Sequence, residues 1–119
     1  MTTPLLRRSF AAFHLVLGLG ILWLSVHSLF GAMRQTTGRH HLHIVILAAV
    51  EAIGAVFFLV PRTVRMGAAL LLITIGAATA AHALAGEWRV DLLIYGVGVW
   101  LVAVYAGARA PDQPIPSTR

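Results

Sequence analysis

Four apolar runs, each about 20 residues long, constrain this chain more than any other feature of its sequence. They cover about residues 10–30, 41–60, 66–85 and 91–107. A helix needs about 20 mostly apolar residues to cross a hydrocarbon core about 30 Å thick. No proline interrupts the runs, and within a bilayer each backbone polar group must be satisfied inside its own segment. The sequence therefore predicts an all-α integral membrane protein, built as a four-helix bundle.

The composition agrees with a membrane protein and excludes other classes. Charged residues make up 11% of the chain, whereas an ordinary soluble domain has about 25%. The chain has no cysteine, so it carries no disulfide or thiolate chemistry of its own. Its net charge of +5 does not indicate nucleic acid, because the basic residues are spread between the apolar runs instead of forming one patch. The expected partner is the lipid bilayer.

The arginines predict how the chain is oriented in the membrane. Two groups fall on opposite sides of the predicted spans: Arg7, Arg8, Arg62, Arg65, Arg109 and Arg119 on one side, and Arg34, Arg39 and Arg89 on the other. Because basic residues favour the cytoplasmic side, both the N and C termini are predicted to be cytoplasmic. Residues 1–110 then form one domain of four transmembrane helices. The proline-rich residues 111–119 are expected to be a disordered C-terminal tail.

Glu51 lies near the middle of the second apolar run. An ionisable group at this depth costs about 2.5–3.5 kcal/mol or more, so its carboxyl group should face the bundle interior, protonated or paired. We expect a hydrogen bond to Tyr95 or Thr74. Glu51 is our candidate catalytic residue, as a proton relay or a ligand anchor. The alternative is a neutral carboxyl group that only fixes the register of the helices.

Three histidines are predicted to lie at a similar depth near the outer, non-cytoplasmic face: His27, His43 and His82. Asp91 joins this layer from the start of the fourth predicted helix, and Tyr95 follows it one turn later on the same face. We predict that these five residues line a cofactor-binding pocket into which the three imidazoles converge.

The residue types in this layer leave several ligands open. Histidine and tyrosine donors suit a quinone headgroup, which we favour. Imidazoles with a carboxylate suit zinc or copper, and two imidazoles on facing helices suit a haem. His14 and His27 also have a spacing similar to that of haem-ligating histidines in cytochrome b helices. In the simplest alternative, the histidines hydrogen-bond to backbone carbonyls, Ser28 or Thr79 and bind nothing.

Several short motifs follow one another from the second predicted helix to the fourth. They are Glu51-Ala-Ile-Gly54, Phe57-Phe-Leu-Val-Pro61, Arg65-Met-Gly-Ala-Ala-Leu-Leu-Leu and His82. In their order and spacing, the stretch from Glu51 through Tyr105 resembles the DoxX-like family of small four-helix bacterial membrane proteins. The resemblance covers the last three predicted helices.

The resemblance implies a protein of the bacterial inner membrane that is linked to redox chemistry. We therefore expect a quinone- or proton-interacting subunit or accessory protein, working with other membrane subunits or as a homo-oligomer. A small proton-coupled transporter is one alternative, although small multidrug exporters of this size carry their essential glutamate in the first helix. Another is a non-catalytic scaffold, or a haem- or metal-binding subunit, of a larger membrane complex. The sequence does not decide whether the protein is an enzyme.

Overall fold

The computed structural model describes residues 3–34 and 40–108, and these residues form four helices. The helices are α1 (Pro4–Arg34), α2 (His40–Leu59), α3 (Val64–Leu84) and α4 (Val90–Ala108). Each is long and apolar enough to cross a membrane. The prediction of an all-α protein with four such helices is confirmed. The predicted tail, residues 111–119, lies outside the described residues.

Helix α1 is longer than the apolar run that predicted it. It begins at Pro4 instead of about residue 10, because proline fits the first position of a helix, where its missing N–H is not needed. At about 1.5 Å per residue, its 31 residues extend over about 46 Å. A hydrocarbon core is only about 30 Å thick, so the turns that carry Arg7 and Arg8 extend beyond the apolar segment.

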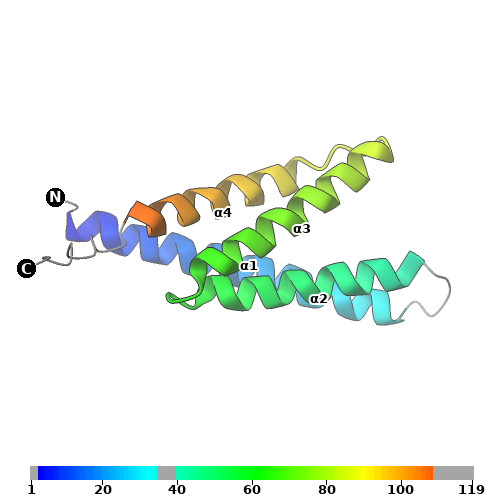
Figure 1. Cartoon of the computed structure of the whole chain (residues 1–119), viewed down its shortest axis with the longest axis horizontal. Helices are drawn as coiled ribbons and strands as arrows, with labels where there is room; N and C mark the ends of the chain where they lie inside the picture. Colours follow the sequence, from blue (N-terminus) through cyan, green and yellow to red (C-terminus); the bar gives the residue numbers. More distant parts are fainter. Residues whose placement is uncertain (1–2, 35–39, 109–119) are drawn as a thin grey trace, which may run out of the picture.

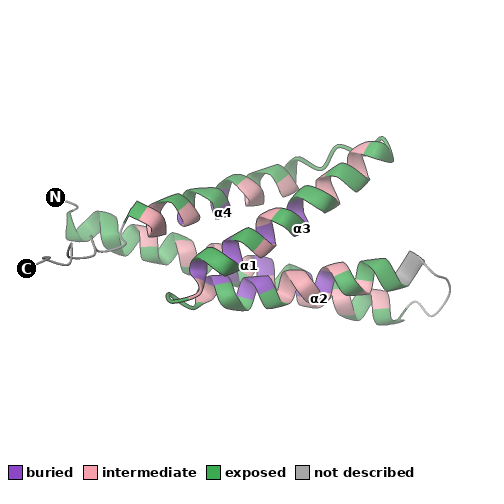
Figure 2. Cartoon of the chain, in the orientation of Figure 1, coloured by how far each residue is buried: buried purple, intermediate pink, exposed green. Residues whose placement is uncertain are grey.

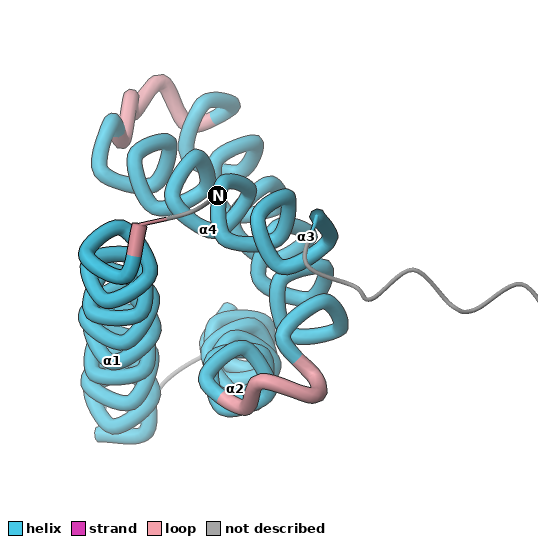
Figure 3. The backbone as a smooth tube through the Cα atoms, turned by 90° about the vertical axis from the view of Figure 1, so that its left-hand side faces the viewer, coloured by secondary structure: helices cyan, strands magenta, loops and turns pink. Residues whose placement is uncertain are grey.

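The helices pack in chain order as two antiparallel pairs (Figure 1). Helix α2 packs against α1 and α3, and α4 packs against α3, with a smaller contact between α4 and α1. In the described part of the chain, α2 and α4 do not pack together. The α1–α2 and α3–α4 pairs lie close at one end and diverge toward the other (Figures 1 and 3). We call these the α2–α3 end and the α3–α4 end, after the connection found at each.

The buried core lies toward the α2–α3 end. It is built from side chains of all four helices: Ile21, Ala55, Phe58, Val64, Ala68, Leu71, Ile75, Val99 and Val102. All the buried residues of α3 precede Gly76, and Figure 2 shows the buried segments gathered in this half of α3 and beside it. The halves of α3 and α4 near the α3–α4 end therefore pack less closely against α1 and α2.

The connection between α2 and α3 explains why the helices meet most closely here. Pro61 has no N–H, so it cannot donate to the carbonyl of Phe57 one turn earlier. The hydroxyl of Thr63 donates to this carbonyl instead, at 2.8 Å. Gly67 then brings α3 directly against the backbone of Phe57 and Phe58, where an added Cβ would overlap the Phe58 nitrogen. Only glycine permits this approach.

We predict that Gly67→Ala destabilises the protein by about 1–3 kcal/mol, the usual effect of overpacking a tight contact. The new methyl group meets backbone atoms, which cannot rotate away as a side chain can. The matched control is Gly76→Ala on the same helix, because an added Cβ there meets nothing within 4 Å. Thermal unfolding in mild detergent measures the stability of both variants. Equal stability of the two variants would contradict the close approach of α2 and α3.

Candidate functional site

Glu51 lies at the interface between α2 and α1, and it is half-buried. The hydroxyl of Ser25 on α1 lies close enough to interact with the carboxyl group of Glu51. Ser25 is only 1% exposed, and its Oγ donates its proton to the carbonyl of Ile21 at 2.8 Å. The carboxyl group is therefore held inside the helical protein by a polar group on another helix.

The partner of Glu51 is Ser25, and not Tyr95 or Thr74 as we expected. The hydroxyl of Thr74 donates to the carbonyls of Leu70 and Leu71 within its own helix, at 3.1 and 3.0 Å. Tyr95 is half-buried against the hydrophobic core on α4, which does not pack against α2. The expectation failed because similar depth does not bring two helices into contact.

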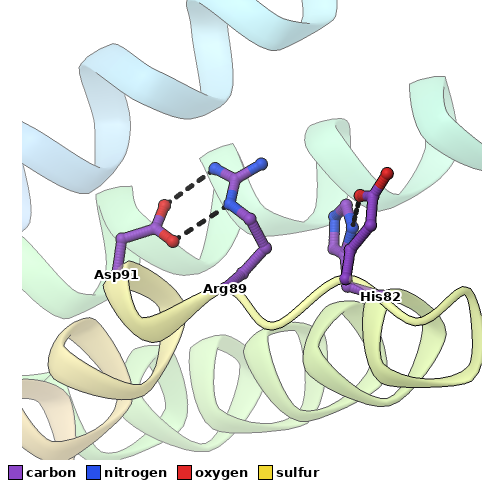
Figure 4. A network of polar contacts seen from close by, with 4 residues as sticks. His82, Arg89 and Asp91 are labelled. Atoms are coloured by element: carbon purple, nitrogen blue, oxygen red, sulfur yellow. Dashed lines mark hydrogen bonds and ion pairs between the residues drawn. The ribbon is translucent and has the colours of Figure 1, made fainter.

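The polar groups near the α3–α4 end form two separate pairs (Figure 4). The Nδ1 atom of His82 lies 3.1 Å from a carboxylate oxygen of Glu87. Arg89 donates two hydrogen bonds, of 3.0 and 2.8 Å, to the carboxylate of Asp91. These hydrogen bonds raise the pKa of the Arg89 guanidinium above its usual value. Both pairs are local, because each joins residues close together in the sequence.

The other two histidines of the predicted layer lie on different helices and are exposed. His27 lines a shallow pocket whose other residues also belong to α1, among them Trp23 and Arg34. His43 lies near the start of α2. His82 lies on α3, beside Glu87.

The three histidines are divided between two helix pairs that diverge toward the α3–α4 end. His27 and His43 belong to the α1–α2 pair, whereas His82, Asp91 and Tyr95 belong to the α3–α4 pair. Among the side chains that the structure describes, those of residues 3–34 and 42–108, no group of three or more histidine, aspartate or glutamate residues is placed to hold a metal ion. A metal site formed by these residues is therefore not found among the described side chains, and the predicted cofactor pocket stays a prediction.

A cavity of about 640 Å³ lies instead near the α2–α3 end, between α1, α4 and the α2–α3 turn. Its lining is mostly apolar and includes four polar side chains: Arg7, Arg8, His14 and Tyr105. The rings of Tyr105 and Phe10 stack at this site, with their centroids 3.8 Å apart. Our sequence analysis did not find this cavity, because its polar residues come from the two ends of the chain.

His14 connects the wall of this cavity to the end of α2. Its Nε2 atom lies 2.7 Å from the carbonyl oxygen of Phe58, and its ring packs edge-on against the Phe58 ring. Phe58 lies in the last turn of α2, where carbonyls lack a donor from their own helix. The imidazole supplies this donor, so its proton lies on Nε2 and Nδ1 is left as an acceptor when the ring is neutral. With Nε2 held in this way, His14 is not arranged as a haem ligand paired with His27.

A comparison of the chain with known protein families, curated proteins and solved structures finds no match. The resemblance to the DoxX-like family therefore stays a prediction that rests on the motifs quoted above. The site has to be interpreted from its own geometry.

We predict that His14→Phe lowers the stability of the protein by about 1–3 kcal/mol, because it leaves the Phe58 carbonyl without a donor. Phenylalanine keeps a ring of similar size, so the effect reports the hydrogen bond more than the packing. His27→Phe is the matched control, since it makes the same substitution at an exposed site on the same helix. Thermal unfolding in detergent compares them. If both variants unfold at the same temperature as the wild type, the hydrogen bond from His14 to the Phe58 carbonyl does not contribute to stability.

Proposed function

We propose that the chain is a multi-pass protein of the bacterial inner membrane, with both termini in the cytoplasm. Four helices apolar enough to span a bilayer support this proposal. The described arginines near the α2–α3 end are Arg7, Arg8, Arg62 and Arg65, whereas only Arg34 and Arg89 lie toward the opposite end. The excess of basic residues favours a cytoplasmic position for the α2–α3 end.

Within this membrane protein, we assign to Glu51 the role of exchanging a proton. The proposed function is that of a redox-linked subunit or accessory protein of the DoxX-like type, which interacts with protons or a quinone. The observation that carries it is the proximity of the half-buried Glu51 carboxyl group to the buried Ser25 hydroxyl across the α1–α2 interface. An ionisable residue within a membrane span is costly to place there and by default marks a functional site.

The hydrogen bonds of Ser25 indicate how this pair handles a proton. A hydroxyl group has one proton to donate, and Ser25 uses it toward the Ile21 carbonyl. While it does so, its oxygen accepts a hydrogen bond from Glu51, which requires a protonated carboxyl group. When Glu51 loses its proton, the hydroxyl rotates to donate to the carboxylate and leaves Ile21. One rotation thus keeps Glu51 hydrogen-bonded in both protonation states.

The partial burial of Glu51 is also consistent with a quinone substrate. A fully enclosed carboxyl group would be cut off from other molecules, whereas Glu51 is half-buried between α1 and α2. Quinones diffuse within the hydrocarbon core, and their reduction takes up protons at the ring oxygens. A neutral carboxyl group reached from the lipid phase is suited to deliver one of these protons, with electrons supplied by a redox partner subunit.

Infrared difference spectroscopy of the purified protein tests this proposal. We expect a carbonyl stretching band from a protonated carboxylic acid at neutral pH, and we expect a short-chain quinone to shift it. Glu51→Gln should remove the band and the quinone response while the protein stays folded, because glutamine keeps the shape and hydrogen bonds of the neutral acid. Glu87→Gln is the control, since Glu87 lies exposed beside His82.

Two outcomes would contradict the proposal. A band that persists in Glu51→Gln would belong to another group, and Glu51 would then be a structural residue. A wild-type band that does not respond to quinone would exclude the quinone interaction. If the band responds instead to an imposed proton gradient together with a transported solute, a proton-coupled transporter becomes the better account.

A further inference from the structure

The cavity near the α2–α3 end has a charged part and an apolar part. Arg7 and Arg8 lie in the first turns of α1 and supply its positive charge. The rest of its wall is mainly apolar, from Phe10, Ala11, Val64, Val102 and Ala106. None of the described residues that line it is acidic. This combination fits a ligand with an anionic head and an apolar body.

The two guanidinium groups have no side-chain partner in the described part of the chain. Among the residues with described side chains, 3–34 and 42–108, Arg7 and Arg8 form no side-chain ion pair and no side-chain hydrogen bond. Arg65 near the same end differs, because its guanidinium donates to the Gly107 carbonyl at 3.1 Å and so caps α4. Arg7 and Arg8 are therefore available to a ligand, whereas Arg65 has a structural role.

We propose that this cavity binds one anionic phospholipid of the inner leaflet. Arg7 and Arg8 hold its phosphate group, and the apolar wall contacts the glycerol region and the first part of the acyl chains. Guanidinium groups bind phosphate oxygens through strong charge-assisted hydrogen bonds. Basic pockets between transmembrane helices on the cytoplasmic side are typical binding sites for anionic lipid headgroups. The proposal rests on the membrane topology proposed above, and not on any role of Glu51.

The position of the cavity gives the lipid a structural effect. The contact between α1 and α4 is the smallest of the four between neighbouring helices, and the cavity is lined by residues of both. A lipid that fills it bridges α1 and α4, the two neighbouring helices with the smallest direct contact. Because a ligand that binds only the folded state stabilises it, bound lipid should raise the unfolding temperature.

Native mass spectrometry of the full chain in detergent tests the proposal, with phosphatidylglycerol and phosphatidylcholine of identical acyl chains as the probes. We expect one phosphatidylglycerol to bind more tightly than phosphatidylcholine and to raise the unfolding temperature. Arg7→Gln and Arg8→Gln should each weaken phosphatidylglycerol binding about fivefold. Arg62→Gln is the matched control, because it removes the same charge at the same end from an exposed residue that does not line the cavity.

Two further variants distinguish the contribution of the cavity to lipid binding from that of the arginine charges. Ala106→Leu and Ala11→Leu fill the apolar part and keep both arginines, so they should reduce lipid binding while the protein still unfolds cooperatively. Having both variants keeps the test decisive if one of them fails to fold.

Three results would overturn the proposal. One is an equal loss of binding in Arg62→Gln, which would indicate general surface charge. Another is equal binding of the two lipids. The third is displacement of phosphatidylglycerol by the same concentration of inorganic phosphate, which would assign the site to a free anion. Labelling of single cysteines placed at Arg62 and Trp88 tests the topology separately, so a failure of topology is distinguishable from a failure of lipid binding.

Discussion

The peptide group of Phe58 is the point at which three of the four helices are held together. Its backbone is in contact with Gly67, which brings α3 against α2. Its carbonyl is bound by His14, which brings α1 to the same place. Its side chain is fully buried within the core. Membrane helices lack a hydrophobic driving force between one another, so close backbone approach and interhelical hydrogen bonds have to supply the stability. Both are found at this residue.

The rest of the structure follows from how far each element lies from Phe58. Near it the helices are tightly packed, and away from it the α1–α2 and α3–α4 pairs diverge (Figure 1). The Glu51–Ser25 pair requires only that α1 and α2 stay together, which they do. A site built from His27, His43 and His82 would require both pairs to converge at the α3–α4 end. The same packing therefore accounts for the proximity of Glu51 and Ser25, whereas the pocket of the three histidines stays a prediction.

The sequence predicted the helices well and the contacts between their side chains less well. Runs of about 20 apolar residues are nearly sufficient to define membrane helices, because the bilayer allows few other structures. Depth along a helix does not define which way a side chain points or how far apart two helices lie. Glu51 was thus correctly expected to contact another helix, but Ser25 was missed as its partner. Ser25 is a small polar residue that directly follows an apolar stretch, and this signal could have identified it.

The central claim is that Glu51 and Ser25 interact across the α1–α2 interface. A double-mutant cycle with Glu51→Ala, Ser25→Ala and the double variant measures this interaction directly, from the free energy of unfolding in detergent. Interhelical hydrogen bonds in a membrane protein have coupling energies of about 0.6 kcal/mol on average, and up to about 1.7 kcal/mol. We predict a favourable coupling energy in this range. If the effects of the two single substitutions simply add, the two side chains do not interact and the proposed proton exchange through this pair is wrong.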